Sequence, residues 1–146
     1  MPSLTTSFGS AGPLISIGVA VSAPREAALV AAGRPVPTPM FAAGLVDTGA
    51  SIPCVDPSII KTLELSPTGS APMHTPSSGT TGHVCNLFDV MLWLLMDGQI
   101  HVASLTIPVA EAQLSQHGFD ALIGRDVLDQ GMMFYNGPSK SITLCF

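Results

Sequence analysis

The sequence predicts an all-β domain of short strands with one or two short helices. Fourteen glycines and thirteen prolines among 146 residues leave little room for long uninterrupted helices. The apolar segments are short and are separated by turn-forming residues, a pattern typical of strands joined by loops. Apolar residues make up 47% of the chain and charged residues 10%, which excludes a disordered protein, and the length suits a single domain.

The first half of the chain is expected to form an arm, two strands and a helix. Residues 1–13 are small and polar and predict a flexible N-terminal arm, so that the folded domain spans residues 14–146. Leu14–Val21 is rich in β-branched residues and Met40–Val46 is an apolar run too short for a helix, so both predict strands. Asp56-Pro57, followed by apolar residues at helical spacing, predicts a short capped helix.

The second half is expected to form two hairpins and a second short helix. Asp-Gly and Asn-Gly between apolar runs are strong hairpin signals. They join Phe88–Met96 to Ile100–Ile107 through Asp97-Gly98, and Met132–Tyr135 to Ser141–Phe146 through Asn136-Gly137. Arg125–Gln130, closed by Gly131, predicts the helix. As the last strand, Ser141–Phe146 is expected to offer an open edge for pairing with another chain.

Charge and composition exclude several kinds of partner. Five Lys and Arg stand against ten Asp and Glu, and no basic run could neutralise a row of phosphates, so nucleic acid is not an expected partner. The longest apolar run, Val90–Met96, is far short of the ~20 residues that cross a membrane. Three scattered cysteines and four histidines lack metal-ligand spacing, so we expect no metal and no cofactor. Free thiols suit a cytoplasmic protein, although Leu14–Ala23 weakly resembles a secretory signal core without a preceding basic residue.

Asp47-Thr48-Gly49 is the strongest candidate for chemistry. The tripeptide follows the apolar strand that ends at Val46 and continues into Ala50-Ser51. About 75 residues later it is matched by Leu122-Ile123-Gly124-Arg125-Asp126. An aspartate at a strand end can be held by backbone N–H groups, while glycine lets neighbouring backbone approach closely. The alternative is a turn-forming aspartate without chemistry.

These two segments together resemble the retropepsin family, the retroviral-type aspartic proteases, and look most like its bacterial or cellular members. The resemblance covers most of residues 14–146 and implies a closed β-barrel with one catalytic loop per chain. It implies that Asp47 is catalytic and activates water. The other residues to which it assigns a role are the loop residues Thr48, Gly49, Ala50 and Ser51, the supporting residues Leu122, Ile123 and Gly124, and a flap at Ser77, Ser78, Gly79, Thr80 and Thr81.

One such loop supplies one carboxylate, whereas peptide hydrolysis in this family needs two. The resemblance therefore implies a homodimer in which each subunit contributes Asp47, acting on a peptide or protein substrate. Other acids could complete a site within one chain, namely Asp56, Asp89, Asp120 and Asp126. None of them stands in a second loop of this kind.

The chain departs from the family at one position beside the loop. The acidic residue that pairs with the arginine of the Gly-Arg segment is replaced here by Ser51, so Arg125 needs another partner. The alternative function is a noncatalytic peptide-binding or dimerisation module on the same fold.

Overall fold

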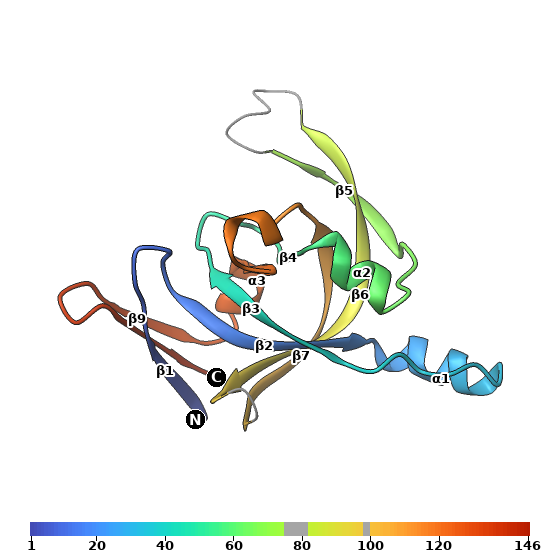
Figure 1. Ribbon diagram of the computed structural model, residues 1–146, viewed down its shortest axis with the longest axis horizontal. Helices are drawn as coiled ribbons and strands as arrows, with labels where there is room; N and C mark the ends of the chain where they lie inside the picture. The colour runs from blue at the N-terminus through green and yellow to red at the C-terminus, as the bar shows by residue number, and fades with distance from the viewer. Residues whose placement is uncertain (75–81, 98–99) are drawn as a thin grey trace.

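The computed structural model describes residues 1–74, 82–97 and 100–146, and its elements are labelled in Figure 1. The strands are β1 (Ser3–Ser7), β2 (Leu14–Val21), β3 (Met40–Val46), β4 (Cys54–Val55), β5 (Gly69–Met73), β6 (His83–Met96), β7 (Ile100–Glu111), β8 (Ala121–Ile123), β9 (Met132–Asn136) and β10 (Ser141–Cys145). The helices are α1 (Ala23–Ala31), α2 (Pro57–Thr62), α3 (Arg125–Leu128) and the 3₁₀ turn η1 (Ser115–His117). None of the described helices is long and apolar enough to span a membrane.

Six strands form a closed barrel, as the sequence led us to expect. They are hydrogen-bonded in the order β2-β3-β8-β4-β7-β6, and the pairing of β2 with β6 closes the ring. The pairs β3–β8 and β4–β7 are parallel, while the other barrel pairs are antiparallel. Strand β5 adds to the outer part of β6 and rises with it above the barrel in Figure 1.

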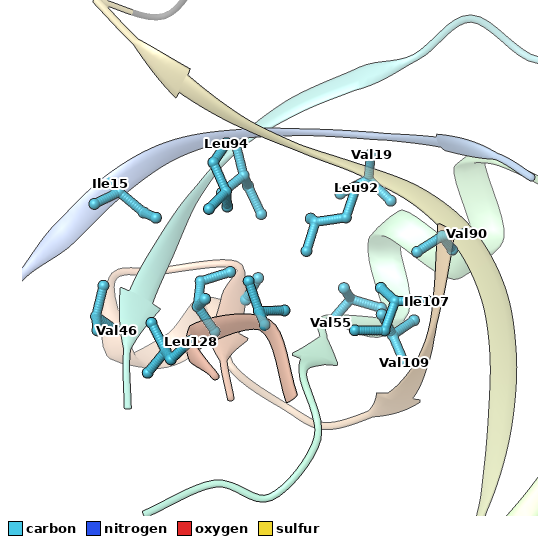
Figure 2. Close-up of a cluster of buried hydrophobic side chains, with 14 of the residues drawn as sticks. Ile15, Val19, Val46, Val55, Val90, Leu92, Leu94, Ile107, Val109 and Leu128 are labelled. Atoms are coloured by element: carbon cyan, nitrogen blue, oxygen red, sulfur yellow. The ribbon is translucent and has the colours of Figure 1, made fainter. Parts of the chain in front are cut away.

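Alternate side chains of the barrel strands fill its interior, as Figure 2 shows. Val19 on β2 lies opposite Leu92 on β6, and both are almost fully buried. Val90 and Ile107 are opposed in the same way on β6 and β7. This apolar filling fixes the register, because a slip of one residue would turn the apolar side chains outward.

The strands predicted from apolar runs are found at the predicted places. Strands β2 and β3 have the expected bounds, and the two predicted hairpins are formed by β6–β7 and β9–β10. Helix α2 follows Asp56 as expected, whereas α3 ends at Leu128, two residues early. Helix α1 was not predicted. The predicted flap residues, Ser77, Ser78, Gly79, Thr80 and Thr81, lie outside the described residues.

A second sheet corrects two expectations about the chain ends. Residues 3–7 were expected in a flexible arm, but they form β1, in which Leu4 is buried and pairs with Leu144. The sheet has the order β1-β10-β9, so β10 is its middle strand. Ser141–Phe146 therefore offers no open edge, because its own chain pairs with it on both sides.

Asp56 is buried and ties helix α2 to the segment that follows β7. Its Oδ1 accepts the backbone N–H of Ser58 at 3.0 Å, which caps α2. Its Oδ2 accepts the N–H groups of Leu114 at 3.0 Å and Ser115 at 2.8 Å. These hydrogen bonds hold the pKa of the Asp56 carboxyl well below its ordinary value, and the bond from the Ser115 N–H has the largest effect. Burial raises the pKa, but its effect is the smallest of the causes.

We expect Asp56→Asn to lower the free energy of unfolding by about 2 kcal/mol at pH 7, because an amide offers one acceptor oxygen where the carboxylate uses two. The folded-state pKa of Asp56 lies below its unfolded value of about 3.9. The stabilisation is therefore complete above pH ~4 and is lost as the pH falls further. Urea titrations at several pH values measure the difference between the two proteins.

Asp89→Asn is the matched control, since Asp89 is exposed on β6. Its effect should stay within about 0.5 kcal/mol at every pH. If the gap between the wild type and Asp56→Asn were the same at pH 2.5 and pH 7, the carboxylate would not carry the pH dependence.

Candidate active site

The Asp47 loop and the Leu122-Ile123-Gly124 segment lie side by side at one end of the barrel. Strand β3 runs parallel to β8, with Val46 opposite Ile123. The backbone N–H of Asp47 continues this ladder by donating to the carbonyl of Ile123 at 3.1 Å. The two segments that carry the sequence resemblance are thus adjacent through backbone pairing.

The Asp47 side chain is oriented by its own loop. The N–H of Gly49 donates to Asp47 Oδ1 at 2.8 Å, and the N–H of Ala50 donates to the Asp47 carbonyl at 3.2 Å. A Cβ atom on Gly49 would lie 3.0 Å from Oδ1, so glycine permits this close approach. Asp47 is half-buried, while Thr48, Gly49 and Ser51 are exposed. Within the described residues Asp47 Oδ2 accepts no hydrogen bond from protein.

The first residues of α3 are hydrogen-bonded to the Asp47 loop. The backbone N–H groups of Arg125 and Asp126 donate to the carbonyls of Ala50 at 2.9 Å and Ser51 at 3.3 Å. The Arg125 guanidinium donates through Nη1 to the Thr48 carbonyl at 3.1 Å and through Nη2 to Ser51 Oγ at 3.2 Å. Ser51 is therefore the partner that replaces an acid at this position.

Gly124 is buried where α3 meets the loop, and only a glycine fits there. A Cβ atom on Gly124 would lie 2.7 Å from the carbonyl carbon of Ile52 and 2.8 Å from its oxygen. The Gly124 φ of −83° is ordinary for any residue, so the requirement comes from the close approach of backbone and not from conformation.

A neutral thiol lies under the same loop. Cys54 on β4 is buried, with its Sγ 3.9 Å from the Ile52 carbonyl. Burial raises the pKa of the Cys54 thiol to about 11, and the charges of Cys85, Asp47 and Asp126 add to the effect. Cys54 therefore stays protonated at physiological pH and is unsuited to act as a nucleophile.

The other candidate acids are occupied with backbone contacts or lie on the surface. Asp120 Oδ2 accepts the N–H of Ala43 at 3.2 Å, which ties it to β3. Asp126 Oδ1 accepts the N–H of Val127 at 3.0 Å, and burial raises the pKa of this carboxyl despite that bond. Asp56 caps α2, and Asp89 is exposed on β6.

The described parts of the chain contain no group of three His, Cys, Asp or Glu side chains placed to hold a metal ion.

The sequence predicted the Asp47 loop and the segment that supports it. It did not predict the hydrogen bonds by which Arg125 anchors the loop. The signal was present, because an arginine directly after a glycine at a helix start can reach a neighbouring loop.

Comparison with known proteins identifies the fold. The crystal structure of a retropepsin-like aspartic protease from Rickettsia conorii is similar to this chain with a TM-score of 0.51 and 13% sequence identity. The similarity covers 97% of this chain and 89% of that one. No protein-family model and no curated protein matches the sequence. The chain therefore has the retropepsin-like fold that its two motifs led us to expect.

We expect Gly124→Ala to destabilise the protein by about 1–3 kcal/mol, because the new methyl group must displace the Ile52 backbone and with it the Asp47 loop. Urea denaturation measures the loss. The amide of Arg125 should also exchange its hydrogen faster, since its bond to Ala50 is weakened.

Gly69→Ala is the control, because a Cβ atom there meets nothing within 4 Å. Its effect should stay within about 0.5 kcal/mol. Equal stability of Gly124→Ala and Gly69→Ala would contradict the packing argument.

Proposed function

We propose that this chain is a homodimeric aspartic endopeptidase in which Asp47 of two subunits activates the water that hydrolyses a peptide bond. The observation that carries the proposal is the Asp47 loop itself. It presents a partly exposed carboxylate, holds one of its oxygens with the Gly49 N–H, and rests on β8 and α3 within a retropepsin-like fold.

The need for two subunits follows from the chemistry. Two carboxyl groups at short range cannot both be ionised, so a pair of Asp47 side chains shares one proton. The ionised carboxyl takes a proton from water as it attacks the peptide carbonyl carbon, and the protonated one gives its proton to the carbonyl oxygen. Collapse of the resulting diol breaks the C–N bond and returns a proton to the leaving amine. The two carboxyls are equivalent and titrate as a unit.

The neighbouring residues have positioning roles in this proposal. The Gly49 N–H fixes the direction of the carboxylate, so that little reorganisation is needed during the reaction. Thr48 is exposed next to Asp47 and is available to the loop of a second subunit. The Arg125 guanidinium keeps the Thr48 carbonyl in place by donating a hydrogen bond to it.

Asp47→Asn should abolish peptide hydrolysis without unfolding the protein, because the amide is nearly isosteric but cannot act as a base. Wild type is then mixed with an equal amount of Asp47→Asn and given time for subunits to exchange. The rate should fall to about one half of the rate of the same amount of wild type alone. Random pairing leaves wild-type pairs as only about a quarter of all dimers. A peptide-cleavage assay with both preparations and with the mixture measures this.

Asp89→Asn provides the comparison in the same mixing experiment and should leave the rate unchanged. A mixture with Asp47→Asn that keeps the full wild-type rate would mean that each chain works alone. If wild type bound peptides without cleaving them, the noncatalytic module would be the better description.

The rate should depend on pH as a bell with an acidic maximum, roughly between pH 4 and 6. Both carboxyls are charged on the alkaline side of the bell and both are neutral on the acid side, and neither state has one acid and one base. Cleavage measured across pH 2.5–9, with and without a chelator, tests this. A rate that rose steadily to pH 9, or disappeared with the chelator, would exclude paired carboxyls.

A further inference from the structure

A cavity of about 250 Å³ lies on the outer wall of the barrel. It is lined by Met91 and Trp93 of β6, by the end of β2, by α1 and by the segment that leads from α1 into β3. Side chains alternate along a strand, and the neighbours Val90 and Leu92 belong to the barrel core, so Met91 and Trp93 point outward.

The cavity is separate from the Asp47 loop. Pro39 lines the cavity directly before β3 begins, whereas Asp47 follows the last residue of β3. Seven strand residues lie between these two positions and span about 20 Å. Figure 1 shows α1 and the loop that follows β3 toward opposite ends of that strand.

Trp93 is held in place as one side of the cavity. Gly18 of β2 lies directly opposite Trp93, and a Cβ atom on Gly18 would lie 2.5 Å from the indole ring. The ring therefore packs against the backbone of β2, where glycine leaves room for it. It also stacks on His101, with ring centroids 5.0 Å apart and an angle of 28° between the planes.

Other parts of the lining are also fixed before any ligand binds. The Ser104 hydroxyl donates to Met91 Sδ at 3.3 Å. Pro37 and Pro39, which line the cavity from the segment before β3, have φ angles fixed by their rings. A ligand therefore loses little of its binding energy to ordering these residues.

Glu26 gives the cavity its charge. Among the described residues that line the cavity, Glu26 is the only one with an ionisable side chain. It is exposed in the first turn of α1, and within the described parts of the chain it forms no salt bridge. Its neighbour Arg25 does not line the cavity. The chain has a net charge of −5, so its overall field also favours a cation.

The size and chemistry of the cavity match one lysine side chain. Lysine has an apolar four-carbon stem and an ammonium group, and both indole rings and carboxylates attract that group. The volume is below the ~300 Å³ at which pockets for drug-sized ligands begin. Phe41, 67% exposed, lies next to Trp93 over Gly18, and Val36 on the lining is 37% exposed. These two side chains extend the apolar surface to residues that would flank the lysine in a protein.

We propose that this cavity binds a lysine side chain of a partner protein. The stem of the lysine lies against Trp93 and Met91, and its ammonium group pairs with the Glu26 carboxylate. The proposal gives the segment between β2 and β3 a binding role of its own. It does not depend on whether Asp47 hydrolyses peptides.

Trp93 provides the measurement, because it is the only tryptophan in the chain and its fluorescence reports on the cavity. The probe is the capped peptide acetyl-Leu-Lys-Leu-amide, titrated into the full chain at low salt. The same peptide with norleucine in place of lysine keeps the stem and lacks the charge. The lysine peptide should bind about three- to fivefold more tightly than the norleucine peptide.

Glu26→Gln should remove this preference, so that both peptides bind equally. Glu111→Gln is the matched control, because Glu111 is exposed at the end of β7 and does not line the cavity, and it should keep the preference.

A second variant tests the cavity without changing charge. Ala23→Leu adds bulk at the lining and should weaken binding of both peptides at least threefold. Ala28→Leu makes the same change at an exposed position of α1 outside the lining and should have no effect.

Several outcomes would overturn the proposal. One is equal binding of the lysine and norleucine peptides to the wild type, and another is a lysine preference that survives Glu26→Gln. If pentylammonium ion alone bound as tightly as the lysine peptide, the cavity would be a site for small amines. If the Trp93 emission changed with protein concentration alone, a second copy of the chain would occupy the cavity. A lysine preference that Glu26→Gln removes supports the proposal even if the protein cleaves no peptide.

Discussion

The close approach of Gly124 to the Ile52 backbone is the constraint on which the rest of the site depends. It lets α3 begin directly beside the Asp47 loop, so that the first free N–H groups of the helix bond to Ala50 and Ser51. The same placement brings the Arg125 guanidinium to the Thr48 carbonyl. Any larger residue at position 124 pushes the loop away from the helix, and the backbone that carries Asp47 then loses its support from α3.

The chain uses buried and exposed carboxylates in different ways. Asp56 is enclosed and has three backbone N–H donors, which keep it ionised well below its ordinary pKa. Asp47 is partly exposed, and among the described residues its side chain has one donor, the Gly49 N–H, which bonds to Oδ1 only. A protein proposed to work in acid therefore has a structural carboxylate that does not become protonated under those conditions.

Local sequence patterns predicted the individual strands and helices. They could not predict the pairing between segments that lie far apart in the sequence. The apolar runs Leu14–Val21 and Met40–Val46 and the cap at Asp56 are local signals, and the structure has them where predicted. Strand β1 was missed because its Ser and Thr residues resemble a loop, and its burial depends on Leu144 at the other end of the chain. The Ser51 partner of Arg125 was missed for the same reason, since the two residues are joined only by the fold.

The pairing of β1 with β10 has a consequence for the order of folding. Ser3 lies opposite Cys145, so this sheet joins nearly the first and nearly the last residue of the sequence. Closing so long a loop costs entropy that local contacts cannot offset, and such pairings form late. The barrel is expected to assemble first and to leave the apolar faces of Ile142 and Leu144 uncovered for a time. Newly made chains would then be most prone to aggregate during that interval, before the two ends meet.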